Sequence, residues 1–148
     1  MDYKGYCFWA KDVIHGNQPH YIIIMSPKNS EGKYMIVAMS SIKYKPLGTK
    51  SSYLHDGKYC SPYDTACPLE IGCIKDDNGK VIPIKNSYIY YKDAFKLTEN
   101  ELLLKQTMYR YEYRCKISDD LLKKIQKGAK ETLDLPKHFE EYFTLFDD

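Results

Sequence analysis

The sequence predicts a single α+β domain built on a small, strongly bent antiparallel sheet with helices at its C-terminal end. Its length of 148 residues is that of one ordinary domain, which can bury a core without disulfides or metals. Strand-like segments fill the first part of the chain and helix-like segments the last part, an order typical of α+β proteins. We expect the core at about residues 5–133 and an acidic helical tail at 134–148.

Three strands are expected in the first third of the chain. Residues 6–13 are rich in aromatic and β-branched types, which favours a strand. After a polar loop at 14–19, the apolar run at 20–26 is short enough for a buried strand. Residues 33–42 form a second buried run, separated from the first by the polar turn 27–32. We expect these two runs to pair as a hairpin in the middle of the sheet.

Residues 43–68 show no sustained hydrophobic period, and a loop of this length within a compact domain is often functional. Strand patterns resume at 69–75 and 80–84. The Asn-Gly pair in the turn 76–79 predicts that these two segments form a hairpin. A further strand is expected at 86–91.

Helical signals appear late in the chain. Thr98 and Glu101 have the spacing of a capping box, which predicts a short helix. Residues 108–117 alternate as a strand does, and Ser118 has the character of a helix N-cap. The segment 135–146 is expected to form a terminal helix from about Pro136. One face of the expected strand carries the tyrosines Tyr109, Tyr111 and Tyr113. The helix after Ser118 is expected to pack on the sheet through apolar residues at helical spacing, namely Leu121, Leu122, Ile125, Ala129 and Leu133.

The chain is expected to be soluble and cytoplasmic. Its first twelve residues carry charges at positions 2, 4, 11 and 12, unlike a signal peptide, and no apolar run approaches the roughly 20 residues of a membrane span. Five cysteines are most simply reduced thiols in this compartment. The alternative is a zinc site, although the spacing of its four potential ligands differs from that of common zinc knuckles. Those ligands are His55, Cys60, Cys67 and Cys73.

Charge is distributed unevenly. The net charge is +2, but residues 131–148 hold six acidic residues and one basic residue. Residues 1–130 therefore hold 21 basic and 14 acidic residues, a net charge of +7. A basic body is compatible with a polyanionic partner such as RNA, and equally with a solubility requirement.

The sequence lacks the glycine-rich phosphate-binding loops, the H-E-x-x-H motif of zinc proteases and the G-x-S-x-G motif of serine hydrolases. If the protein is an enzyme, its active site would therefore consist of a few side chains on the sheet. His20 begins the second expected strand, while Ser40 and Ser41 end the third. Antiparallel pairing would bring them to one rim of the sheet, close to Lys11. A base, hydroxyl groups and lysines suit RNA cleavage without a metal. Alternatively, His20 is a hydrogen-bonded structural residue and the serines cap a turn.

The order of these segments resembles the MazF/PemK family of toxin endoribonucleases. In that family, a glycine-containing loop leads into a strand that begins R-P and runs V-V-V-L-S, and a later strand ends in P-I-T-S. Here GNQPHYIIIMS and MIVAMSS occupy these two places. KNSYIYYKDAFKLTENEL resembles the family's S-Y-V strand and the segment after it, and CKISDDLLKKIQKGAKETL resembles the C-terminal helix with the strand that leads into it. The resemblance covers roughly residues 5–133 and rests on the order and spacing of short motifs.

The resemblance implies an SH3-like barrel, a homodimer, metal-independent cleavage of single-stranded mRNA without a cofactor, and neutralisation by a cognate antitoxin. The family's catalytic arginine falls on His20 and its threonine on Ser40, with Ser41 in the adjoining serine place. Histidine differs from arginine because its charge changes near neutral pH, so it can act as a base. The residues expected to contact RNA are Lys11, Asn17, Gln18, Lys43 and Lys45.

Two other functions fit the same sequence. One is a non-catalytic binding module on the same barrel, such as a toxin that grips a protein. The other is a zinc-stabilised adaptor that uses His55 and the three nearby cysteines.

Overall fold

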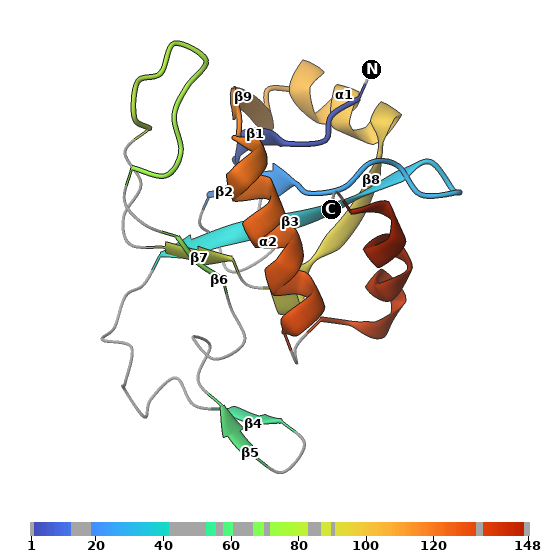
Figure 1. The fold of residues 1–148 in the computed structure, drawn as a ribbon. Helices are drawn as coiled ribbons and strands as arrows, with labels where there is room; N and C mark the ends of the chain where they lie inside the picture. The colour runs from blue at the N-terminus through green and yellow to red at the C-terminus, as the bar shows by residue number, and fades with distance from the viewer. Residues whose placement is uncertain are drawn as a thin grey trace.

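The structure is a computed structural model, and it describes residues 2–12, 19–41, 53–55, 58–60, 67–69, 72–82, 87–89, 91–132 and 135–146. Within these residues the fold is α+β, with an antiparallel sheet packed against helices (Figure 1). None of the helices in this part of the chain has the length and apolar character needed to cross a bilayer.

Nine strands and four helical segments are described. The strands are β1 (Tyr6–Ala10), β2 (His20–Ile24), β3 (Lys33–Ser41), β4 (Tyr53–His55), β5 (Lys58–Cys60), β6 (Cys67–Leu69), β7 (Ser87–Ile89), β8 (Phe95–Thr98) and β9 (Tyr111–Lys116). The α-helices are α1 (Glu99–Thr107) and α2 (Asp119–Glu131), and the 3-10 segments are η2 (Tyr91–Asp93) and η3 (Lys137–Leu145).

The main sheet has the order β6-β7-β3-β2-β1-β9 and is antiparallel throughout. The predicted central hairpin is confirmed, because β2 and β3 pair through Ile22–Ile24. The other edge of β3 is shared, with β8 on its first half and β7 on its second half. Among the described strands, β6 and β9 lie at the two ends of the order, so the sheet is open and is not a closed barrel.

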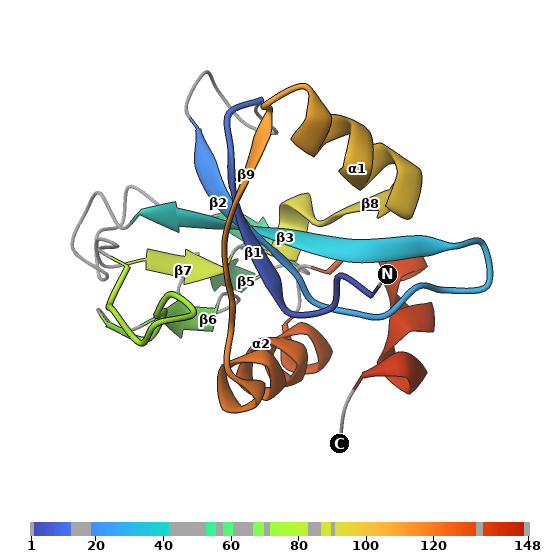
Figure 2. The same cartoon turned by 90° about the horizontal axis from the view of Figure 1, so that it is seen from above.

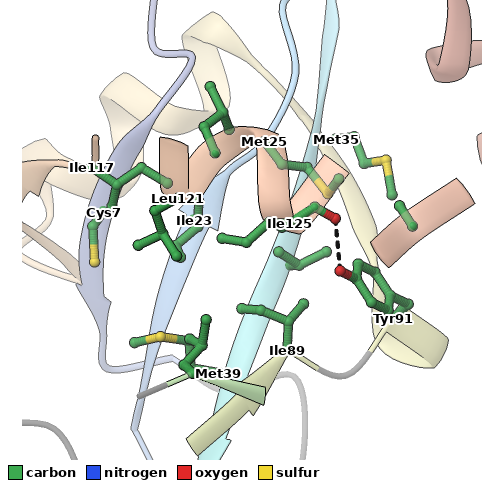
Figure 3. Close-up of a cluster of buried hydrophobic side chains, with 14 of the residues drawn as sticks. Cys7, Ile23, Met25, Met35, Met39, Ile89, Tyr91, Ile117, Leu121 and Ile125 are labelled. Atoms are coloured by element: carbon green, nitrogen blue, oxygen red, sulfur yellow. Dashed lines mark hydrogen bonds between the residues drawn. The ribbon is translucent and has the colours of Figure 1, made fainter. Parts of the chain in front are cut away.

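The larger core lies between α2 and the sheet (Figures 1 and 3). Ser118 caps α2 as the sequence predicts, by accepting a hydrogen bond from the Leu121 N–H. The apolar face of α2 is buried, which satisfies its 3.6-residue period. The Tyr91 hydroxyl donates to the Ile125 carbonyl at 2.7 Å, so η2 is joined to α2 inside this core (Figure 3).

The opposite face of the sheet carries a second, smaller core beneath α1. The Thr98 side chain and the Glu101 side chain form the predicted capping box, which starts α1 directly after β8. Leu102 is the buried residue of this helix and packs with Tyr34 and Phe8. The start of the helix is thus encoded locally, whereas its orientation depends on packing against β8 and β9.

The C-terminal segment is helical from just after Pro136, as expected, but it is a 3-10 helix. Its aromatic residues pack into the core on the α2 side, and Tyr142 donates to the Lys33 carbonyl at 2.8 Å. On the exposed side of η3, the Glu141 carboxylate accepts hydrogen bonds from the Asn29 side-chain amide at 2.7 Å and from the Lys96 ammonium group at 3.2 Å. Residues 135–146 of the acidic segment are therefore part of the packed molecule.

The middle of the chain follows the sequence prediction in part. The hairpin predicted from 69–75 and 80–84 forms where it is described, because Lys75 and Val81 make an antiparallel bridge and the Ile82 N–H donates to the Ile74 carbonyl at 2.9 Å. The expected turn has Gly79 at φ +83°, and it is also held against β9, where Asp77 accepts from the Tyr113 hydroxyl at 2.8 Å. Within 43–68, β4 and β5 form a small hairpin that the sequence analysis did not predict, and β8 was also missed.

Candidate active site

Three strand ends meet at one end of the sheet, which we call the rim. β1 ends at Ala10, and this residue pairs with His20 at the start of β2 and with Tyr111 at the start of β9. Figure 2 shows these strand ends together with the end of α1 at the top of the view. The next residue, Lys11, continues the contact because its N–H donates to the Arg110 carbonyl at 2.8 Å.

β3 approaches this rim from the other side of β2. Ile22 pairs with Ala38, so His20 lies two residues before this pair and Ser40 two residues after it. The backbones of Ser40 and Ser41 pair with Tyr88 and Ser87 of β7. The strand pairing therefore brings the backbone of the serine pair to the same end of the sheet as His20.

His20 is half-buried at the first position of β2. The next residue, Tyr21, pairs with Trp9 across β1 and β2, and their ring centroids lie 4.7 Å apart. Burial raises the pKa of Tyr21, whereas the nearby Arg114 guanidinium acts in the opposite direction. His20 thus directly precedes an aromatic pair that packs across the two strands.

Lys11 is not an isolated cation at this rim. It forms an ion pair with Glu112, and the same carboxylate accepts from Arg114 at 3.0 Å. The hydrogen bond from Lys11 lowers the pKa of Glu112, so the carboxylate stays ionised at neutral pH. Two cations share one anion here, which leaves a net positive charge available to a phosphate.

A second ion pair lies behind the rim, between α1 and the end of β1. Lys105 pairs with Asp12, and its ammonium group also lies 5.7 Å from the centre of the Tyr111 ring. Burial raises the pKa of Tyr111 well above its ordinary value, and the Asp12 carboxylate adds to this shift. Tyr111 is therefore a neutral, structural residue at physiological pH.

The turn between α1 and β9 has an unusual residue at its centre. Met108 caps the helix, and the Tyr109 N–H donates to the Gln106 carbonyl at 3.0 Å. The Arg110 N–H donates to the Lys105 carbonyl at 2.8 Å. This pair of bonds is a Schellman motif, in which glycine usually takes the left-handed position. Here that position belongs to Tyr109, with φ +58°.

Several predicted site residues lie outside the described part of the chain, namely Asn17, Gln18, Lys43 and Lys45. Of the four possible zinc ligands, His55, Cys60 and Cys67 end or begin the short strands β4, β5 and β6, and only Cys73 has a described side chain. The Cys73 side chain is half-buried. Within the described residues no three His, Cys, Asp or Glu side chains are grouped as metal ligands would be.

Sequence reasoning missed the contribution of residues 109–114 to the rim. The alternation from 108 to 117 assigned Tyr109 to the strand, but the strand begins only at Tyr111. No glycine or asparagine follows the end of this helix, so the sequence carried no signal for a residue in the left-handed conformation. Arg110 and Arg114 were treated only as the wet face of a strand.

No protein-family model, curated protein or solved structure matches this chain.

Proposed function

We propose that this protein is a metal-independent endoribonuclease of the MazF/PemK type that cleaves single-stranded RNA at the rim. The observation that carries the proposal is the pairing of Ala10 with both His20 and Tyr111, which gathers a titratable base and several cations at one sheet end. An SH3-like barrel topology, a homodimer and neutralisation by an antitoxin protein belong to the same proposal.

The reaction that suits these residues is attack by the RNA 2′-hydroxyl on the adjacent phosphorus. His20 accepts the 2′-hydroxyl proton as general base while water protonates the departing 5′-oxygen, or His20 protonates that oxygen as general acid while water accepts the 2′-hydroxyl proton. Ser40 or Ser41 donates a hydrogen bond to the phosphate, and the positive charge of Lys11 and Arg114 offsets the charge that develops on it. The products are a 2′,3′-cyclic phosphate and a free 5′-hydroxyl.

A cleavage assay tests this proposal. Purified protein is incubated with mixed-sequence RNA in EDTA, and the ends of the fragments are mapped by sequencing. We expect defined cuts in single-stranded regions. Intact RNA at protein concentrations well above that of the substrate would overturn the enzyme proposal.

The principal alternative is a non-catalytic module that binds a protein. It is favoured by the exposure of three apolar side chains on α1 and its cap, Leu103, Leu104 and Met108. Large exposed apolar groups of this kind often mark protein contacts. Under this alternative, substitutions of His20 would leave binding of the partner protein unchanged. Metal analysis of the purified protein tests the zinc-adaptor alternative separately.

A further inference from the structure

Tyr109 combines two properties that packing alone does not explain. It occupies the left-handed position of a Schellman motif, where a side chain is disfavoured and glycine is usual. Its side chain is also 77% exposed, the largest exposure among the large hydrophobic residues of the described chain. Strained positions of this kind are concentrated at functional sites. The strain therefore suggests that the ring is retained for something it contacts outside the chain.

The surroundings of Tyr109 are cationic. Segments 9–12 and 105–114 supply Lys11, Lys105, Arg110 and Arg114 against two carboxylates, Asp12 and Glu112, a net charge of +2. Both carboxylates are already held in ion pairs with these cations. Arg110 follows Tyr109 directly and is exposed, and its carbonyl accepts from the Lys11 N–H. The exposed ring of Tyr109 thus precedes an exposed cation, Arg110, whose backbone is bonded to the rim through Lys11.

We propose that Tyr109 is a stacking platform for one unpaired nucleobase, with Arg110 and Lys11 holding the adjacent phosphates. The choice of ligand rests on the proposed function. Base stacking on aromatic side chains, combined with basic groups along the backbone, is the usual way in which proteins hold single strands. In a duplex the bases are stacked on one another, so a ring that protrudes from a turn selects single-stranded substrate.

The same surface could in principle contact a protein through Leu104 and Met108, which are 58% and 54% exposed. Two observations favour nucleic acid at Tyr109. The net charge of the flanking segments is positive, and the turn is connected by backbone hydrogen bonding to the rim where cleavage is proposed. A protein contact on α1 would need neither feature.

Binding to a strand that cannot be cleaved tests the inference. The probe is a fluorescein-labelled 2′-O-methyl RNA of about 12 nucleotides, within the usual site size for single strands, used alone and annealed to its complement. Binding is followed by fluorescence anisotropy in EDTA at several salt concentrations. Tyr109→Asn removes the ring but suits the left-handed conformation. Tyr109→Phe keeps the ring, and Leu103→Asn alters an exposed apolar residue of the same helix.

We expect Tyr109→Asn to weaken single-strand binding by about tenfold, the scale of one lost stacking contact. Its salt dependence should stay unchanged, because no charge is lost. Tyr109→Phe should bind within about twofold of the unchanged protein, since stacking needs only the ring. Arg110→Gln should flatten the log–log salt plot by about 0.7. Leu103→Asn should have no effect, and the duplex should bind more weakly than the single strand.

Equal binding of the single strand by Tyr109→Asn and the unchanged protein would overturn the inference, as would an absence of binding or an equal loss for the duplex. These results are independent of cleavage, because the probe lacks the attacking hydroxyl. A protein that cuts RNA but is insensitive to Tyr109→Asn refutes the platform alone. A protein that binds through Tyr109 but does not cut RNA refutes the nuclease alone.

Discussion

His20 and Tyr109 reach the rim in different ways. Strand pairing places His20 at the rim, since its backbone is opposite Ala10 in a regular antiparallel ladder. Tyr109 is placed by the turn that follows α1, where two backbone hydrogen bonds fix the left-handed conformation that a residue with a side chain disfavours. The hydrophobic pattern of the sequence predicts the position of His20 at the start of a strand. It does not predict the conformation of Tyr109, because a left-handed conformation at a non-glycine residue follows from the packing of α1 and β9.

At His20 we predict a catalytic effect without a large effect on affinity. His20→Ala should lower kcat by roughly 10²-fold or more, the usual scale for the loss of a general base. Single-turnover cleavage and anisotropy of an uncleavable strand measure the two quantities separately. His138→Ala is the control, because this exposed residue lies in η3 and its substitution should leave kcat unchanged. Full activity in His20→Ala would move the active site elsewhere.

At Tyr109 we predict that function and stability oppose one another. Tyr109→Gly should raise the free energy of unfolding by about 0.5–1 kcal/mol, because relief of left-handed strain exceeds the entropic cost of glycine. Chemical denaturation measures this change. Tyr109→Ala, which keeps the Cβ atom at the strained position, is the matched control and should show no such gain. Destabilisation by Tyr109→Gly would mean that the ring is held by packing, contrary to its exposure.

Among the elements, those with local signals were predicted well. The capping box of α1 and the N-cap of α2 lie where Thr98 and Ser118 predict them, since both depend on hydrogen bonds within four residues. Elements that depend on distant contacts were predicted poorly. β8 has a half-buried pattern without clear alternation and exists because it pairs with β3. The turn at 76–79 formed as its Asn-Gly pair predicts, whereas its contact with β9 through Asp77 had no local signal.

For η3 we predict loosening at acid pH. Hydrogen bonds from the Asn29 side chain and from Lys96 lower the pKa of Glu141 below its ordinary value of 4.5. A lowered pKa in the folded state means that the stabilisation is present above that ordinary value and is lost as the pH falls through the folded value. The protection of amides in residues 137–145 against exchange, relative to the intrinsic rate at each pH, should therefore fall as the pH is lowered below 4.5.

Glu141→Gln is the variant that tests the origin of this change. It should loosen η3 already at neutral pH and remove most of its acid sensitivity. Glu140→Gln is the matched neighbour, an exposed carboxylate in the same segment, and should behave like the unchanged protein. Equal acid sensitivity in both variants would assign the effect to other carboxylates.

For the whole molecule, the α+β class and the central hairpin followed from the sequence, because strand and helix periods differ clearly in this chain. The convergence of β1, β2 and β9 could be anticipated only in part. Antiparallel pairing predicted that the backbone of Ser40 would approach that of His20, whereas no local pattern showed that β9 would pair with β1. Ala10 and Tyr111, which pair at the rim, are 101 positions apart in the sequence, and only the folded sheet brings them together.

The most direct test of the central proposal follows once a cut site is known. A short RNA containing that site is compared with the same strand carrying a single 2′-deoxy nucleotide immediately 5′ of the scissile phosphate, both in EDTA. If the 2′-hydroxyl is the nucleophile, the first strand yields a 2′,3′-cyclic phosphate detectable by mass spectrometry, and the second remains intact. Cleavage of the 2′-deoxy strand would contradict the mechanism.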